Sequence, residues 1–172
     1  RNGMFTVNIA LMKRMGPIWK PIFGVVHAPV NRTTWLGGID VPATRITDAE
    51  TSEISVNRQT NTQTRLVASG SHRAERDEKF AKELGEHELV RMGSSLKACV
   101  VAEGSADLYP RFGPTSCWDI AAAHAVVEAA GGFVLSPQCE PLVYDLVDEV
   151  LNPYFLVACS TKWNDIWSQN QD

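Results

Sequence analysis

The chain has 172 residues, of which 44% are hydrophobic and 21% charged, and its formal net charge is −4. These values predict one globular domain, or a large part of a bigger one, that can bury a real core. The chain has no long basic run, which argues against duplex DNA or RNA as a partner. A small anionic ligand needs only two or three local cations.

The first third of the chain reads as short strands separated by turns. Residues 5–12 alternate and are rich in β-formers, the Gly16-Pro17 pair breaks the pattern, and residues 18–28 resume it, so a hairpin is predicted. Residues 31–40 predict a third short strand. Residues 41–64 are polar and predict either a mobile surface loop or an edge hairpin.

The rest of the chain alternates strands with helices, which predicts a layered α/β domain. Strands are expected at residues 66–68, 88–92, 133–135 and 154–158. Helices are expected at residues 74–84, which Gly85 closes, at 96–102, at 120–130 and at 161–167. Residues 142–150 are ambiguous.

The stretch from Gly93 to Gly132 holds the two central helices, and each begins after small hydroxyl residues. A helix N-terminus presents unpaired N–H groups and a partial positive charge. Two such ends that face each other would form a site for phosphate and its metal. We therefore expect the chemistry of the protein to lie in this stretch.

The first of these helices follows the sequence Gly93-Ser94-Ser95-Leu96-Lys97, in which the serines can cap the helix. The helix is apolar nearly all round, so Lys97 stands beside a hydrophobic environment, where an ammonium group needs an anionic partner. One interpretation is phosphate binding by Ser94, backbone N–H groups and Lys97. The other is a capped core helix from which Lys97 reaches solvent.

The second helix follows Thr115-Ser116-Cys117-Trp118-Asp119. With Ser116 as the N-cap, Asp119 falls at the third helical position, where its carboxylate can complete a capping box. The alternative is that Asp119 is a carboxylate ligand for Mg²⁺.

Three further polar residues are candidates for the same site or for ordinary structural roles. Arg111 lies between two prolines in what we predict to be a stiff loop, and its planar guanidinium suits bidentate binding of a phosphate, although a surface ion pair is equally compatible. His72 follows a predicted strand and could donate to the same anion. His124 is one helical turn before Glu128, which indicates a structural pair.

The four cysteines form no C-x-x-C motif, and the sequence has no stretch of about 20 apolar residues. We therefore expect reduced thiols, no transmembrane segment and a cytoplasmic protein. The sequence leaves the oligomeric state and peripheral membrane association open.

Together these motifs resemble the CysQ-type 3′(2′),5′-bisphosphate nucleotidases of the inositol monophosphatase superfamily. The resemblance is carried by G-S-S-L-K, by L-Y-P-R-F-G-P-T-S, and by W-D followed by an alanine-rich helix and G-G. It also includes R-N-G-M-F-T-V-N-I-A-L at the start and S-G-S-H-R at 69–73, so it spans most of the chain. Residues 41–64 are the least similar.

The resemblance implies a layered α-β-α-β-α sandwich and Mg²⁺-dependent hydrolysis of 3′-phosphoadenosine 5′-phosphate to AMP and phosphate, in sulfur assimilation. It makes Asp119 a metal ligand that also lies near the substrate. It makes Ser94, Lys97 and Arg111 the groups that hold the phosphates of a bisphosphate nucleotide, with His72 as a further contact.

The chain departs from that family at one motif, because D-P-x-D-G-T, which supplies most metal ligands there, does not occur. We therefore expect residues 1–172 to be the C-terminal part of one phosphatase domain, inactive by itself and poorly stable, with apolar surface exposed. Two alternatives keep part of this interpretation. One is a phosphatase for inositol monophosphate or a sugar bisphosphate, and the other is a non-catalytic domain that binds phosphonucleotides.

Overall fold

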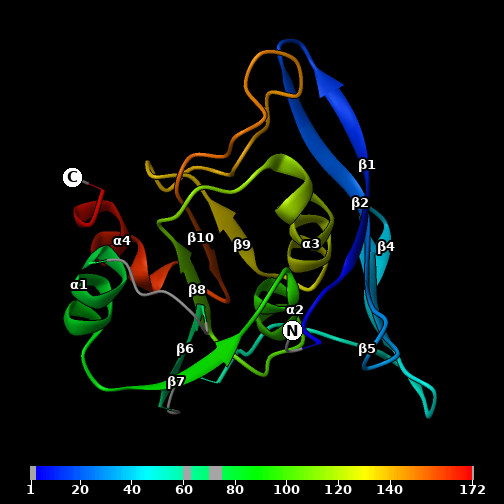
Figure 1. Cartoon of the computed structure of the whole chain (residues 1–172), viewed down its shortest axis with the longest axis horizontal. Helices are drawn as coiled ribbons and strands as arrows, with labels where there is room; N and C mark the ends of the chain where they lie inside the picture. Colours follow the sequence, from blue (N-terminus) through cyan, green and yellow to red (C-terminus); the bar gives the residue numbers. More distant parts are fainter. Residues whose placement is uncertain (1–2, 60–62, 70–74, 172) are drawn as a thin grey trace.

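The structure is a computed structural model that describes residues 3–59, 63–69 and 75–171. In this part of the chain it has two five-stranded sheets with helices packed between them (Figure 1). The first sheet is antiparallel, with its strands in chain order: β1 (Val7–Met15), β2 (Ile18–Ala28), β3 (Thr33–Gly38), β4 (Val41–Ile46) and β5 (Thr51–Glu53).

The second sheet is mixed, because β6 pairs in parallel with β7 and β8, whereas β10 pairs antiparallel with β8 and β9. In spatial order its strands are β7 (His87–Met92), β6 (Thr64–Ser69), β8 (Leu108–Arg111), β10 (Phe155–Ala158) and β9 (Phe133–Leu135).

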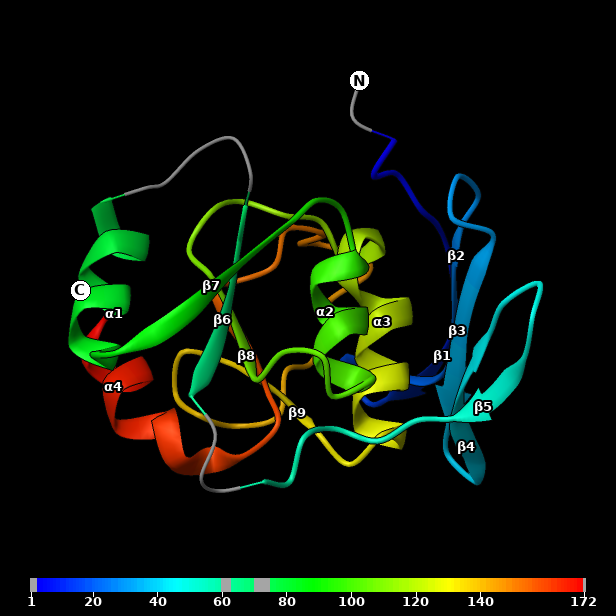
Figure 2. The ribbon, with the colours of Figure 1, turned by 90° about the horizontal axis from the view of Figure 1, so that it is seen from below.

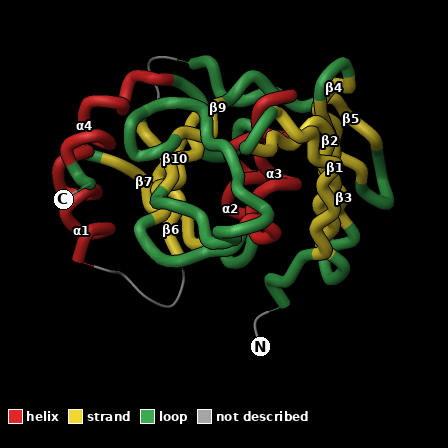
Figure 3. The backbone as a smooth tube through the Cα atoms, turned by 90° about the horizontal axis from the view of Figure 1, so that it is seen from above, coloured by secondary structure: helices red, strands yellow, loops and turns green. Residues whose placement is uncertain are grey.

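Two helices lie between the sheets, and two cover the far face of the second sheet (Figures 2 and 3). The inner pair is α2 (Leu96–Ala102) and α3 (Cys117–Ala129). The outer pair is α1 (Glu75–Leu84) and α4 (Asn164–Gln169), which follows a short 3-10 turn, η1 (Thr161–Trp163). The order sheet, helices, sheet, helices confirms the layered α/β architecture and corresponds to four layers of the sandwich that the resemblance implies.

The outer face of the first sheet carries exposed apolar side chains. Val7, Ile9 and Leu11 alternate along β1 with side chains that face α3, and they are 49%, 64% and 57% exposed. None of the described helices packs against this face (Figure 3). The exposed apolar surface that the sequence predicts is therefore present.

The helix α3 packs closely against the first sheet because the contact is made of small residues. Its alanines bring the helix backbone near β2, and a Cβ atom on Gly24 would lie 2.0 Å from the carbonyl oxygen of Ala122. Only glycine fits at such a contact. The helix also contains the predicted structural pair, with His124 Nε2 3.2 Å from Glu128 Oε1.

The outer helices attach to the second sheet through an aromatic cluster. Phe80 of α1 and Trp167 of α4 both contact Phe112, with ring centroids 5.9 and 5.1 Å from the Phe112 ring. The indole N–H of Trp167 donates to the carbonyl of Ser136 at 2.8 Å, so its one polar group is satisfied. These contacts explain why the C-terminal tryptophans anchor a helix, as the sequence suggests.

Two local expectations need correction or refinement. The segment 109–111 is not a loop, because Tyr109, Pro110 and Arg111 belong to strand β8. A proline is tolerated there since β8 pairs with β6 only at Leu66–Leu108, so no ladder bond to β6 is lost at Pro110. Residues 41–64 contain β4 and β5, which pair antiparallel, and β5 is the edge strand of the first sheet. The four cysteines are free, as predicted.

A buried carboxylate, Asp107, joins the start of β8 to two other segments. Its oxygens accept hydrogen bonds from the backbone N–H of Arg65 at 2.7 Å, from the Arg65 guanidinium at 3.1 and 3.2 Å, and from the Asn57 amide at 2.7 Å. Burial by itself would raise the pKa of Asp107, but the hydrogen bonds from Arg65 and Asn57 outweigh it and hold the pKa below its usual value.

We expect Asp107→Asn to lower the free energy of unfolding by about 2 kcal/mol at pH 7, because the Arg65 charge loses its partner. Since the folded-state pKa is depressed, this contribution is present above the unfolded-state pKa and is lost as pH falls through the folded-state pKa. Urea unfolding should therefore show a wild-type advantage at pH 7 that shrinks below about pH 4. Asp48→Asn, at an exposed ion pair with Arg32, is the control and should change stability little. Equal stability of Asp107→Asn and wild type at pH 7 would contradict the assignment.

Candidate active site

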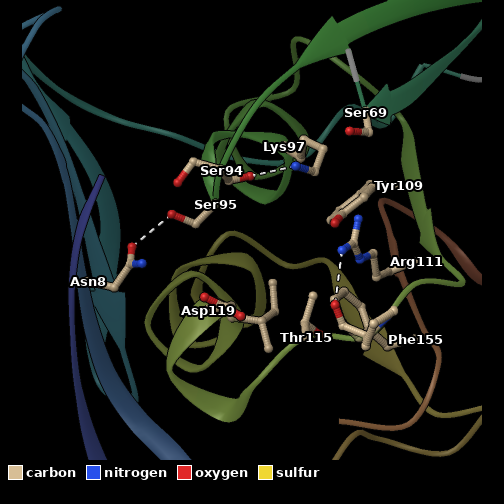
Figure 4. Close-up of a pocket in the computed structure, with 12 residues that line it drawn as sticks. Asn8, Ser69, Ser94, Ser95, Lys97, Tyr109, Arg111, Thr115, Asp119 and Phe155 are labelled. Atoms are coloured by element: carbon tan, nitrogen blue, oxygen red, sulfur yellow. Dashed lines mark hydrogen bonds between the residues drawn. The ribbon is translucent and has the colours of Figure 1, made fainter. Parts of the chain in front are cut away.

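A hollow of about 300 Å³ opens between the N-terminal ends of α2 and α3, beside the end of β8 (Figure 4). The structure thus brings together Ser94, Lys97, Arg111 and Asp119, which are four of the five candidate site residues. His72, the fifth, lies outside the described residues. The other residues that line the hollow are Asn8, Ser69, Ser95, Tyr109, Pro114, Thr115, Ile120 and Phe155.

Lys97 is buried, with an exposed fraction of 6%, and does not reach solvent as one interpretation of the sequence proposed. Its ammonium donates to the carbonyl of Ser94 at 2.9 Å and lies 5.3 Å from the centre of the Tyr109 ring. Both partners are neutral, and no carboxylate of the described residues lies within ion-pair distance of Lys97. The charge is therefore available to an anion in the hollow.

The surroundings of the hollow disfavour the protonated, charged form of Lys97. Burial, and then the positive charge of Arg111, lower the pKa of Lys97 from 10.5 to about 8, although the Asp119 carboxylate acts in the opposite direction. Burial also raises the pKa of Tyr109 to about 12, so the phenol stays neutral and does not compensate either cation. An anion that binds between Lys97 and Arg111 would relieve this repulsion.

Arg111 is held at the rim by its own loop. One of its terminal nitrogens donates to the carbonyl of Pro114 at 3.1 Å, and a Cβ atom on Gly113 would lie only 3.4 Å from the guanidinium carbon. Its Nε is buried and has no hydrogen-bond partner within the described chain. A buried donor without a partner is uncommon, and it leaves Arg111 with one unused hydrogen-bond donor beside the hollow.

Asp119 has the structural role that is one of the two interpretations of the sequence. Its Oδ2 accepts a hydrogen bond from the backbone N–H of Ser116 at 2.9 Å, in a capping box at the start of α3. The carboxylate is nevertheless exposed, and Figure 4 shows it at the lower side of the hollow, across from Lys97. Capping uses one oxygen, so the other is left for a ligand.

The residues around the hollow fit part of a magnesium site. Mg²⁺ is usually held by one or two carboxylates together with waters and phosphate oxygens of the substrate. Asp119 offers one such carboxylate, and no cluster of three or more candidate ligands occurs among the described residues. A site here would therefore need oxygen ligands beyond Asp119.

The serines before α2 do not cap the helix through their side chains, contrary to the expectation. Ser95 is the N-cap residue but makes no side-chain cap. Its hydroxyl donates instead to Oδ1 of Asn8 on β1, at 2.8 Å, and the Ser94 hydroxyl lies 2.6 Å from that of Thr6. The reason is that the segment leading into β1 passes close to Gly93, where a Cβ atom would be 3.0 Å from Cβ of Met4.

Two residues that line the hollow escaped the sequence analysis. Asn8 shares the face of β1 that carries Ala10 and Met12, and a polar residue in an otherwise apolar alternation was a signal that could have found it. Tyr109 lies between Lys97 and Arg111 in Figure 4 and packs edge-on against Phe155, with ring centroids 5.9 Å apart. An aromatic residue in a buried strand gives no such signal.

Comparison with known proteins places this arrangement in a family. Residues 1–164 match the model of the inositol monophosphatase family. The chain belongs to the inositol monophosphatase family. Family membership agrees with both the layered fold and the resemblance seen in the sequence.

Several relatives with similar sequences carry the name of one enzyme. The chain is 43% identical over 162 residues to the 3′(2′),5′-bisphosphate nucleotidase CysQ of Escherichia coli (strain K12), covering 92% of this chain and 61% of that protein. It is 36% identical over 154 residues to the CysQ of Buchnera aphidicola subsp. Acyrthosiphon pisum (strain APS), covering 87% and 54%. The chain therefore spans less than two thirds of the length of these relatives.

Solved structures of the inositol monophosphatase family show the same fold. The crystal structure of CysQ from Bacteroides thetaiotaomicron superposes with a TM-score of 0.79 and 35% identity, covering 92% of this chain and 64% of that one. An inositol monophosphatase from Zymomonas mobilis superposes with a TM-score of 0.76 at 20% identity, covering 98% and 63%, which shows the shared fold alone. Among the described residues, no helix combines the length and apolar character needed to cross a membrane.

Proposed function

We propose that this chain forms the substrate-binding part of an Mg²⁺-dependent phosphatase that hydrolyses 3′-phosphoadenosine 5′-phosphate to AMP and phosphate. One observation carries the proposal: two cations, Lys97 and Arg111, share a hollow with a single carboxylate, Asp119. A ligand with two separate phosphates suits this arrangement, because one phosphate can contact the cations while the other lies where Asp119 would hold the metal. The relatives named as 3′(2′),5′-bisphosphate nucleotidases support the same substrate.

In this proposal the chain's own residues bind and orient the nucleotide. The guanidinium of Arg111 and the ammonium of Lys97 hold the 5′-phosphate through charge-assisted hydrogen bonds, which are stronger in a partly buried site than in water. The 3′-phosphate then lies near Asp119, which would supply one oxygen ligand to the metal. Magnesium, when bound, polarises the phosphoryl group and lowers the pKa of the attacking water.

We further propose that the remaining metal ligands come from residues outside these 172, because D-P-x-D-G-T is absent from the chain. The chain alone should then bind the nucleotide without turning it over. The four free cysteines favour a reducing compartment, so we assign the reaction to the cytoplasm, where it would recover AMP from the by-product of sulfate activation.

The proposal predicts a clear order of substrates for the complete gene product that contains this chain. With Mg²⁺ present, kcat/KM for 3′-phosphoadenosine 5′-phosphate should exceed that for 3′-AMP about 100-fold, since 3′-AMP lacks the phosphate that contacts Lys97 and Arg111. Inositol 1-phosphate and fructose 1,6-bisphosphate serve as the comparison for the two related activities. Phosphate release is measured for all four.

Other orders would favour the alternatives. A preference for inositol 1-phosphate or for the sugar bisphosphate would replace the nucleotide as substrate and keep the family. Binding of the adenosine bisphosphate without phosphate release from any of the four would favour a non-catalytic phosphonucleotide-binding protein.

A further inference from the structure

A chain of hydrogen bonds connects the start of β1 to the loop before α2. The Thr6 hydroxyl lies 2.6 Å from the Ser94 hydroxyl and 2.7 Å from the Ser95 hydroxyl, and the Ser95 hydroxyl donates to Oδ1 of Asn8 at 2.8 Å. Ser94, Ser95 and Asn8 line the hollow, but Thr6 does not. Thr6 therefore joins three residues of the site without facing a ligand itself.

The chemistry of these groups fixes the direction of the chain. The side-chain oxygen Oδ1 of Asn8 can only accept a hydrogen bond, so the Ser95 hydroxyl donates its one proton to it. Ser95 must then accept from Thr6, and Thr6 must accept from Ser94. Hydrogen bonds are therefore donated in the order Ser94 to Thr6, Thr6 to Ser95, and Ser95 to Asn8. Each of the three hydroxyl groups donates its single proton within this network.

The Ser94 backbone is held in an uncommon conformation. Its φ is +51°, in the left-handed region that residues with side chains rarely adopt. This conformation directs the Ser94 carbonyl to the ammonium of Lys97, which donates to it at 2.9 Å. Figure 4 shows the Ser94 side chain turned away from Lys97 while its carbonyl points to it. Local strain of this kind persists where surrounding contacts enforce it.

We propose that Thr6 is a positioning residue for phosphate binding. Its hydroxyl holds Ser94 in the left-handed conformation, and the Ser94 carbonyl in turn fixes the ammonium of Lys97 at the rim of the hollow. Thr6 acts through Lys97 and touches no substrate. The proposal rests on the function proposed above only in that Lys97 binds a phosphate.

The test replaces the Thr6 hydroxyl in the complete gene product and follows two readouts. Thr6→Val keeps the shape and removes the hydroxyl, so we expect the affinity for inorganic phosphate, measured by calorimetry, to fall about tenfold. The KM for the adenosine bisphosphate should rise by a similar factor while kcat changes less than about twofold. Amide hydrogen exchange at Ser95 and Leu96 should accelerate about tenfold in the absence of any ligand.

Two variants serve as controls. Thr6→Ser retains the hydroxyl and should restore phosphate affinity and exchange to wild-type values. Thr44→Val removes a threonine hydroxyl from β4 of the first sheet, where it donates to the carbonyl of Pro42, and should change neither readout.

The outcomes separate this proposal from the proposed function. Wild-type phosphate affinity in Thr6→Val, with or without faster exchange, would overturn the positioning role. Absence of phosphate release from the adenosine bisphosphate by the wild-type protein would instead overturn the nucleotidase function, and the phosphate affinity of Thr6→Val would still decide the role of Thr6.

Discussion

Replacing Asp119 by asparagine in the complete gene product should lower turnover of the adenosine bisphosphate about 1,000-fold, which corresponds to about 4 kcal/mol of activation free energy. The reason is that asparagine keeps the shape of the side chain but removes the charge that would hold the metal. Its amide oxygen can still accept the backbone hydrogen bond from Ser116, so the fold should be preserved. Initial rates at saturating Mg²⁺ measure the loss, and the thermal unfolding midpoint measures the fold.

A second variant separates the two roles of Asp119. Ser116→Ala weakens the cap of α3, at an expected cost of about 1 kcal/mol of stability, but leaves the Asp119 carboxylate in place. We expect it to be less stable than wild type and close to normal in turnover. If Asp119→Asn retained near-normal turnover, Asp119 would be a helix cap and nothing more.

Removal of the buried ammonium is expected to have the second largest effect. Lys97→Ala should weaken binding of the adenosine bisphosphate by about 3 kcal/mol, or roughly 150-fold, because the phosphate loses a charge-assisted contact in a partly desolvated site. Binding of 3′-AMP, which lacks the 5′-phosphate, should change far less. Calorimetric titration of both nucleotides checks the difference, and equal losses for the two would place Lys97 elsewhere in the site.

The same residue should make binding depend on pH. With the pKa of Lys97 near 8, the ammonium is protonated below pH 8 and loses its charge above it. Phosphate monoesters are already dianionic above pH 7, so affinity for the adenosine bisphosphate should fall as pH rises from 7 to 9.5. A bound phosphate raises the pKa of Lys97, and binding near pH 8.5 should therefore take up protons.

Lys97→Arg is the matched control for this pH dependence, because arginine stays protonated throughout the range. Its affinity is expected to be lower than that of wild type, since the guanidinium does not fit the ammonium position, but it should not change between pH 7 and 9.5. A wild-type affinity that stays flat across this range would contradict the assignment. So would an identical decrease in the arginine variant, because the titrating group would then be another one.

Much of the fold could be predicted because local signals and tertiary packing agree. The alternation of β2 and the breaks around it give its bounds directly. The apolar helix α2 is buried along its whole length, and the alanine-rich middle of α3 is buried too, as their composition indicates. Pro110 was the main failure. A proline usually excludes a strand interior, but here β8 pairs with β6 only at Leu108, so no ladder bond to β6 is lost at Pro110. Such pairing geometry is not visible in one strand's own sequence.

Only those site residues that are close to one another in the sequence could be predicted. Ser94, Lys97, Arg111 and Asp119 stand within one stretch, and the turn and cap residues around them indicate where each helix begins. Thr6 immediately precedes β1 of the opposite sheet and Asn8 belongs to it, and their role depends on the segment before β1 passing close to Gly93, next to Met4. Long-range contacts of this kind leave no local periodicity. This is also why the hydroxyls of Ser94 and Ser95 were wrongly expected to cap α2.

The most direct test of the account is the position of the 5′-phosphate in a crystal structure of the complete gene product with AMP. The account predicts this phosphate within about 3 Å of both Lys97 Nζ and the Arg111 guanidinium, with the ribose directed toward Asp119. A 5′-phosphate bound at Asp119, or a nucleotide bound outside the hollow between α2 and α3, would contradict it.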